Sequence, residues 1–151
     1  MASWAQFEAA APELAAAGRR LIYRTTTGEA LLATVRGGEL PRIHPVYVAI
    51  LEGRLVAFLL DSPKATDLAQ DGRFALHAHQ DPAAPHEFVV RGRARLIDDD
   101  ATRRETSKAW YFEAYEGHGL FEFDIEHAIL GERESRNAWP PRYTSWRSDG
   151  T

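Results

Sequence analysis

Six strand-like runs of apolar or alternating residues make up most of the sequence and leave little room for another architecture. They cover residues 30–36, 42–51, 55–60, 73–79, 86–98 and 120–130. Glu52-Gly53-Arg54 joins two of these runs by a tight hairpin turn, so we expect those two strands to pair antiparallel. The pattern predicts an α+β fold of six or so mainly antiparallel strands, with inserted and flanking helices, that form a closed or partly closed barrel.

Helical stretches lie beside and between these strands. Residues 3–21 predict an N-terminal helix that Ser3 caps and Pro12 divides in two. The acid-led stretch at residues 98–117 predicts a further helix. Its aromatic residues are expected to form a face that packs in the core or an interface: Trp110, Tyr111, Phe112 and Tyr115.

The length of 151 residues predicts one domain, in which residues 1–22 form a helical segment and residues 137–151 an aromatic tail. Two residues mark irregular strands. Pro45 predicts a free edge or a bulge, because proline cannot donate a hydrogen bond to a neighbouring strand. Gly92 predicts a bulge or a close approach of another chain segment.

The composition argues against several classes of function. The 22 acidic and 18 basic side chains give a net charge of −4, so no basic field would attract nucleic acid. The absence of cysteine excludes disulfides, thiol catalysis and cysteine-ligated metals. No apolar run reaches the roughly 20 residues of a membrane span, and the N-terminus does not resemble a signal peptide. These features predict a cytoplasmic protein that binds no membrane.

The segment LLDSPKATDLAQDG, residues 59–72, changes from strand to helix at Ser62, Pro63 and Lys64. One interpretation is local, because serine caps helices and proline suits their first position. The other is chemical. A helix start offers free N–H groups and partial positive charge, to which Lys64 adds a full charge, and together they would bind an anion.

Arg42 strengthens the chemical interpretation. It alternates with His44 along the second strand, so both side chains share one face. If this strand pairs with the next one across the turn at residues 52–54, Arg42 lies opposite residue 64. Two cations beside a hydroxyl would then form a phosphate site. The alternative is a solvent-exposed pair of cations.

Other candidates have simpler explanations. His77 and His79 share a strand face near His86, but no partner carboxylate has a suitable spacing, so we predict no metal site. A solvated face or a dimer contact would account for a row of arginines, Arg91, Arg93 and Arg95. Aromatic residues of the tail would either cover a flat ring or pin the tail: Trp139, Tyr143 and Trp146.

An ordered set of motifs resembles the flavin-binding segment of the pyridoxamine 5′-phosphate oxidase-like family, the FMN-binding split barrels. The set comprises Ala33-Thr34, the turn from Glu39 to Arg42, His44-Pro45-Val46, Ser62 to Lys64, and Asp67-Leu68, followed by EFVVRGRARLIDD. The resemblance covers roughly residues 4–100. It implies a split β-barrel and a homodimer with the cofactor at the subunit interface.

The resemblance also implies a set of cofactor-binding residues. Arg42, Ser62 and Lys64 would hold the FMN phosphate. The chain from Ile43 through His44 to Val46 would run along the isoalloxazine ring. Apart from the resemblance, Trp146 of the aromatic tail is a further candidate to line the pocket over the flavin.

Some positions depart from the family pattern. Tyr47 occupies the place of a lysine that helps to hold the substrate phosphate in the true oxidase. The oxidase's later substrate cluster has no counterpart here, so we predict that the protein is not a vitamin B6 oxidase.

Two classes of function therefore remain. The first is an FMN-dependent oxidoreductase acting on a small molecule, because a flavin supplies redox chemistry without a strong acid or base from the protein. The second is a binding module, without turnover or with other chemistry, for a deazaflavin coenzyme, haem or another anionic ligand. The sequence identifies neither the substrate nor any catalytic residue.

Overall fold

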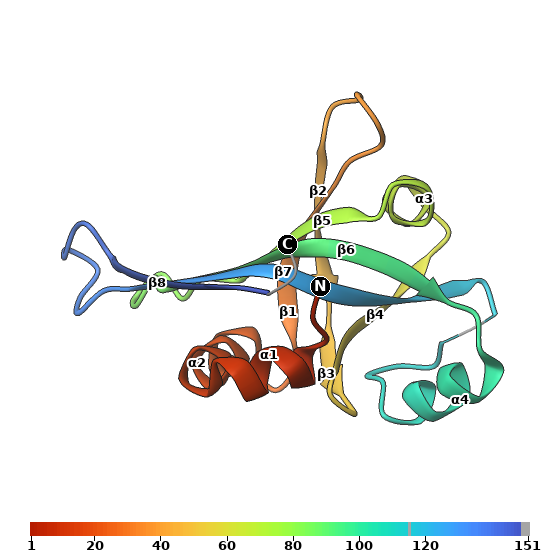
Figure 1. Cartoon of the computed structure of the whole chain (residues 1–151), viewed down its shortest axis with the longest axis horizontal. Helices are drawn as coiled ribbons and strands as arrows, with labels where there is room; N and C mark the ends of the chain where they lie inside the picture. Colours follow the sequence, from red (N-terminus) through yellow and green to blue (C-terminus); the bar gives the residue numbers. More distant parts are fainter. Residues whose placement is uncertain (115, 149–151) are drawn as a thin grey trace.

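The computed structural model describes residues 1–114 and 116–148 and forms a sheet-rich α+β fold (Figure 1). Within these residues the helices are α1 (Trp4–Ala10), α2 (Pro12–Ile22), α3 (Pro63–Gln70) and α4 (Asp100–Lys108). The strands are β1 (Glu29–Thr34), β2 (Arg42–Tyr47), β3 (Ala49–Leu51), β4 (Arg54–Leu60), β5 (Arg73–Ala78), β6 (Glu87–Ile97), β7 (His118–Glu132) and β8 (Arg142–Arg147).

All the strands belong to one antiparallel sheet that does not close on itself. Its order is β2-β1-β5-β6-β7-β4-β3, and β8 pairs with the C-terminal part of β7, from His127 to Glu132. The two long strands β6 and β7 run through the centre of the molecule, while β1 and β2 cross them (Figure 1). The predicted α+β split barrel is confirmed. The sheet has eight strands rather than six because the run at residues 42–51 divides in two and the tail adds β8.

The division falls at Val48, which is fully buried. Its N–H donates to the carbonyl of Gly28 at 3.0 Å, and its carbonyl accepts from the Tyr111 hydroxyl at 2.7 Å. The bend sends β2 to one end of the sheet and β3 to the other. Two successive pieces of one apolar run therefore form the two outermost strands of the strand order.

This division corrects the sequence-based reason for placing Arg42 opposite residue 64. The hairpin turn is where we predicted it, with Glu52 and Gly53 at φ values of 51° and 72°, which favour a twisted two-residue turn. However, only β3 pairs with β4 across that turn. The strand β2 pairs with β1 instead, and Arg42 lies beside Thr34.

One face of the sheet carries the core, and alternation along each strand explains which side chains enter it. Leu32, Leu76, Val90 and Ala128 occupy one row across β1, β5, β6 and β7, and all are buried. The predicted N-terminal helix is confirmed. It divides at Ala11 and Pro12, and Ser3 caps its first half by accepting from the Gln6 N–H. Trp4 and Phe7 of α1 are fully buried against this core.

Gly92 lies at a bulge, one of the two features predicted for it. The register between β6 and β7 shifts between Arg91 and Gly92. A methyl group on Gly92 would lie 2.0 Å from the Asp124 carbonyl oxygen, so only glycine allows this approach. The bulge directly follows the pair of Arg91 with His127, and Glu126 of β7 is the extra residue.

The predicted helix at residues 98–117 is too long. The helix α4 ends at Lys108, so the aromatic residues that follow do not form a helical face. Trp110 packs edge-on against Phe58 at 5.5 Å, while the Tyr111 hydroxyl reaches Val48. These tertiary contacts override helix propensity here. Tyr115 lies outside the described residues.

No helix among the described residues has both the length and the apolar character required to cross a bilayer.

Candidate functional site

The start of α3 has the local structure predicted for Ser62 and Pro63. Ser62 is the N-cap residue, and its hydroxyl accepts from the Ala65 N–H at 3.4 Å and donates to the Leu60 carbonyl at 2.8 Å. Pro63 occupies the first helical position, which needs no donor. The Lys64 Nζ lies 3.5 Å from the Ser62 oxygen, at the limit of a hydrogen bond. Hydroxyl and ammonium are thus together at the helix start.

Asp67, one turn further along α3, gathers the other cations of the site. Its carboxylate is 1% exposed and accepts from the Thr34 hydroxyl at 2.8 Å. The Arg36 Nε donates to one carboxylate oxygen at 3.0 Å, and the Arg42 Nε donates to the other at 2.9 Å. Both arginines remain about one-third exposed. Asp67 therefore fastens α3 to the ends of β1 and β2 and fixes the direction of two guanidinium groups.

The electrostatics of this cluster favour an ionised Asp67. Burial by itself raises the pKa of this carboxyl group, but the hydrogen bonds from Thr34, Arg42 and Arg36 outweigh burial and lower the pKa. With Lys64 nearby, three side-chain cations surround one carboxylate at a helix start. The local charge is positive, which suits an anion.

Arg42 uses Nε for Asp67, and within the described residues its terminal nitrogens have no hydrogen-bond partner. In the first turn of α3, the backbone N–H of Lys64 is also available to a ligand. The N–H groups of Ala65 and Thr66 are not, because both donate to Ser62. These donors define what a ligand would meet: an ammonium, a guanidinium end and a backbone N–H.

The remaining predicted residues of β2 alternate between the two faces of the sheet. His44 and Val46 share the core-facing side with Arg42 and are half-buried. Ile43 points to the other side and is 64% exposed. Because β2 is the outermost strand at its end of the sheet, its free backbone edge is open to a flat ligand or another chain.

Trp146 lies elsewhere in the protomer. It belongs to β8, pairs with Ala128 of β7, and packs against Phe7 of α1 with ring centroids 5.2 Å apart. The strands β1, β5, β6 and β7 separate it from β2 in the sheet order. Within a protomer, Ser62 and Lys64 thus meet at the start of α3, and Asp67 ties Arg42 to the same helix, whereas Trp146 lies apart from them.

Sequence reasoning missed the residues that organise the site. Asp67 entered only as part of the Asp67-Leu68 motif, with no role, and Arg36 and Thr34 were assigned none. An aspartate five residues after a helix cap, with arginines at the ends of two strands, was the available signal. Only the pairing of β1 with β2 reveals that these groups meet.

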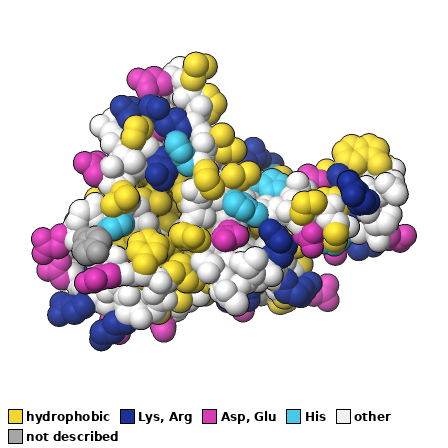
Figure 2. Space-filling view, turned by 180° about the vertical axis from the view of Figure 1, so that it is seen from behind, with side chains coloured by type: hydrophobic (Ala, Val, Ile, Leu, Met, Phe, Trp, Pro, Cys, Tyr) yellow, Lys and Arg dark blue, Asp and Glu magenta, His cyan; other side chains and the backbone are white. Residues whose placement is uncertain are grey.

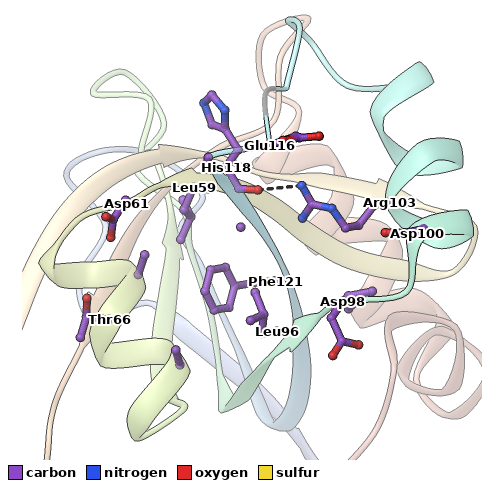
Figure 3. A pocket seen from close by; sticks show the side chains of 15 residues that line it. Leu59, Asp61, Thr66, Leu96, Asp98, Asp100, Arg103, Glu116, His118 and Phe121 are labelled. Atoms are coloured by element: carbon purple, nitrogen blue, oxygen red, sulfur yellow. Dashed lines mark hydrogen bonds between the residues drawn. The ribbon is translucent and has the colours of Figure 1, made fainter.

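The opposite side of α3 has the opposite charge. A cavity of about 640 Å³ lies there between α3 and α4, with Leu96 and Phe121 between its walls (Figure 3). Among the described residues that line it, Arg103 is the one basic side chain apart from His118, and it donates to the His118 carbonyl at 2.9 Å. Four carboxylates line the same cavity: Asp61, Asp98, Asp100 and Glu116. This cavity would repel a phosphate, so the Asp67 side of α3 is the side for an anion.

The sheet face turned away from the core carries an exposed apolar area. We call this side the outer face. On β2 it includes Tyr47, 48% exposed, together with Ile43 and Pro45, and Leu31 of β1 lies beside Pro45. Hydrophobic side chains gather over this part of the molecule, with histidines among them (Figure 2). Exposed apolar areas on open edge strands are typical of surfaces that another chain can cover.

The histidines considered for metal binding have other contacts. The His77 Nδ1 lies 2.6 Å from the carbonyl of Ala78, and His79 lies 4.0 Å from a Glu29 oxygen. His86 accepts from the Arg133 N–H. Across residues 1–114 and 116–148, no group of three or more potential ligands could hold a metal ion.

Comparisons with known proteins reveal a shared fold. No family model and no curated protein matches this sequence. Among solved structures, a haem-binding protein from Mycobacterium smegmatis superposes with a TM-score of 0.62 at 21% identity over 87% of this chain. The chain spans only 57% of the length of that protein.

Two further structures are similar. A Clostridium acetobutylicum protein of the pyridoxinephosphate oxidase family, related to a general stress protein of Bacillus subtilis, gives a TM-score of 0.64 at 10% identity, covering 89% of this chain and 94% of that one. An FAD-binding protein from Mesorhizobium loti gives 0.57 at 18% identity, covering 75% and 90%. The chain therefore has the split β-barrel fold of the pyridoxamine 5′-phosphate oxidase-like proteins, as the resemblance of its motifs implied.

Proposed function

We propose that the protein binds FMN, with the cofactor phosphate at the start of α3, and acts as an oxidoreductase on a small molecule. The observation that carries this proposal is the Asp67 cluster, in which a buried carboxylate on α3 holds the Arg42 guanidinium, while Lys64 and Ser62 meet at the start of the same helix. The motif resemblance and the shared fold support the choice of a flavin over other phosphates.

The residues present fit a phosphate monoester. A dianion needs several charge-assisted donors, and the site offers the terminal nitrogens of Arg42, the ammonium of Lys64 and the backbone N–H of Lys64. The Asp67 carboxylate would not repel the phosphate through a bare oxygen, because both of its oxygens already accept hydrogen bonds from Thr34, Arg36 and Arg42.

When bound, a flavin would supply the hydride or electron transfer. The chain's own residues would bind and orient it. Asp67 would hold the Arg42 guanidinium in place before the ligand arrives, which reduces the entropy lost on binding. The exposed Ile43 and the free edge of β2 would lie along the ring, and the apolar side chains nearby would exclude water.

Lys64→Ala tests the phosphate site, and Lys108→Ala is a matched control because the chain contains only these two lysines. Each charge-assisted bond to phosphate contributes roughly 1.5–3 kcal/mol, so Lys64→Ala should weaken FMN binding about tenfold or more. Lys108 pairs with Glu105 on the exposed side of α4, and its loss should leave the affinity unchanged. Equal FMN affinities of the two variants in a fluorescence titration would remove the proposal.

We also propose that the protein is a homodimer whose second copy covers the outer face around β2. The exposed Ile43 and Tyr47 and the open edge of β2 support this. Light scattering should then give about twice the chain mass of 16.9 kDa. Ile43→Asp should shift the particle toward the mass of one chain, whereas a wild-type mass of one chain at micromolar concentration would contradict the dimer.

The substrate is proposed to be different from vitamin B6 phosphates. Tyr47 replaces the expected lysine, and its ring contacts Tyr111 and Phe112 at centroid distances of 5.9 and 6.3 Å. An aromatic surface of this kind suits a flat molecule of low charge. Supplied with pyridoxine 5′-phosphate and oxygen, the reconstituted protein should form little pyridoxal 5′-phosphate. Turnover like that of a dedicated oxidase would contradict this assignment.

A binding role for a deazaflavin coenzyme or haem is the second candidate. The deazaflavin would use the same phosphate site. Haem is supported by the half-buried His44 on β2 and by the haem-binding name of one similar structure. The visible spectrum of the purified protein separates a flavin from haem, and reduction by a nicotinamide followed by turnover with an acceptor separates an enzyme from a carrier.

A further inference from the structure

A second group of cations lies on the outer face, far along the sheet from β2. Arg91 of β6 pairs with His127 of β7, and His127 pairs with Arg147 of β8. The three residues therefore occupy one row, with their side chains on the same face. They line a cavity of about 250 Å³ together with Arg73, Phe74, Gly92 and Glu126.

The carboxylates near this cavity do not neutralise it. Within the described residues, neither Arg91 nor Arg147 forms an ion pair. Arg73 is occupied, because its Nε donates to Asp71 at 2.6 Å. Glu126 is the one carboxylate on the cavity lining. The three guanidinium groups of the lining therefore outnumber the two carboxylates nearby, which are Glu126 on the lining and Asp71, the partner of Arg73.

The contact between Arg91 and His127 fixes the state of the imidazole. The Arg91 Nη2 lies 2.8 Å from the His127 Nδ1. Because a guanidinium only donates, Nδ1 must accept, and the ring must be neutral with its proton on Nε2. Burial, Arg147 and Arg91 all lower the pKa of His127, which agrees with a neutral ring. His127 is 9% exposed, and among the described residues its Nε2–H has no hydrogen-bond partner, so the N–H is an oriented donor available to a ligand.

Small residues continue the row toward β2. Ala75 of β5 is the neighbour of Arg91, and Ala33 of β1 is the neighbour of Ala75. Both are partly exposed on the outer face. With strands about 4.8 Å apart, the two alanines provide roughly 10 Å of low, apolar surface beside the cations. A second copy over β1 and β2 would bound this surface at its Ala33 end.

We propose that Arg91, His127 and Arg147 form a binding site for the carboxylate or phosphate group of a small planar molecule whose ring lies over Ala75. The two guanidinium groups would attract the anionic group of the ligand. The imidazole N–H and the alanine surface would fix the orientation of its anionic group and of its ring. The site uses none of the residues that would hold the FMN phosphate, so it stands or falls independently of that proposal.

The test uses three probes on the ¹⁵N-labelled full chain: nicotinate, its neutral amide nicotinamide, and inorganic phosphate. Nicotinate should shift the ring nitrogen signals of His127 and the backbone signals of Arg91 and Ala75 in a saturable way. Nicotinamide should not. Phosphate should shift the His127 signals and leave that of Ala75 in place. Equal responses to nicotinate and nicotinamide, or no response at His127, would overturn the site.

Variants separate this site from the others. The double variant Arg91→Gln with Arg147→Gln removes both exposed guanidinium groups and should weaken nicotinate binding at least tenfold, with FMN affinity unchanged. Arg93→Gln is the matched control on the same strand and should bind nicotinate as the wild type does. Lys64→Ala should also keep nicotinate binding. Unchanged nicotinate affinity in the double variant, whose fold a backbone NMR spectrum verifies, would refute the proposal.

Discussion

The two groups of cations in this protein are held in different ways. At the start of α3, a buried carboxylate accepts from Arg36 and Arg42 and directs both. On the outer face, a neutral imidazole accepts from Arg91, and Arg147 has no carboxylate partner within residues 1–114 and 116–148. In the first group a carboxylate orients the arginines before any ligand binds, whereas in the second group an imidazole takes that place.

The difference indicates which group contributes to the stability of the fold. Asp67 links α3 to β1 and β2, so its ion pairs are structural as well as available for binding. The contact between Arg91 and His127 links two strands that are already paired along their length. Removing the first interaction should therefore lower stability, while removing the second should change titration and binding more than folding.

The largest effect is expected for Asp67→Asn. The substitution leaves two arginines facing a buried neutral amide, and removing one partner of a buried ion pair costs about 3–5 kcal/mol. Because both arginines are about one-third exposed and can turn to water, we discount this to roughly 2–3 kcal/mol in the free energy of unfolding. Urea denaturation measures it.

Asp61→Asn is the control for Asp67→Asn, since Asp61 is exposed and forms no ion pair among the described residues. Its urea midpoint should match the wild type. If Asp67→Asn is as stable as this control, the carboxylate is not what fastens α3 to the sheet.

Gly92→Ala should follow in size and should disturb the second group. The added methyl would lie 2.0 Å from the backbone oxygen of Asp124, which cannot move without distorting β7. Overpacking of this kind costs about 1–3 kcal/mol. The bulge next to the pair of Arg91 with His127 should also be disturbed, and the His127 ring signals should shift. Gly38→Ala, where nothing lies within 4 Å of the added methyl, should leave both readouts as in the wild type.

Acid should weaken the first group in a defined pH window. The pKa of Asp67 is lowered below its ordinary value of 3.8, so the ionised carboxylate stabilises the fold fully above that value. This contribution is lost as the pH falls through the lowered pKa of the folded state. The stability difference between wild type and Asp67→Asn should therefore be constant near neutral pH and shrink below about pH 4. A difference that grows toward acid would reverse the assigned direction.

The smallest expected effect is on the titration of His127. Its pKa lies below the ordinary 6.5 because of burial, Arg147 and Arg91. Arg91→Gln removes one cation and the donor that requires a neutral Nδ1, so the pKa should rise toward the ordinary value. An NMR titration of the ring protons measures this, with Arg93→Gln as the comparison. A pKa that stays the same or falls in Arg91→Gln would mean that Arg91 does not hold the neutral form.

The features that the sequence predicted correctly depend on neighbours along the chain. The Ser62 cap, the turn at Glu52 and Gly53, and the bulge at Gly92 each follow from local chemistry, and each is present. The α+β split barrel follows from the number and alternation of the strands and from the ordered motifs.

The features that were missed depend on distant partners. Val48 divides an apolar run because its backbone finds Gly28 and Tyr111, which no local pattern announces. The strand β8 exists because β7 extends far enough to pair with it. Asp67 is at the centre of the site because β2 pairs with β1, which brings Thr34 and Arg42 to the same carboxylate. Its role therefore depends on the choice of strand partner, which a single sequence leaves open.

The bend at Val48 also affects how the protein opens. The Val48 N–H donates to Gly28, and the Tyr111 hydroxyl accepts from the Gly28 N–H at 3.0 Å while donating to the Val48 carbonyl. The strands β2 and β3, at the two ends of the sheet, are thus joined at Val48, and the Tyr111 hydroxyl links this residue to Gly28 through two hydrogen bonds. Neither end can separate without the other, so the Val48 amide hydrogen should exchange with deuterated water only when the whole domain unfolds, even though the open edge of β2 begins one residue away.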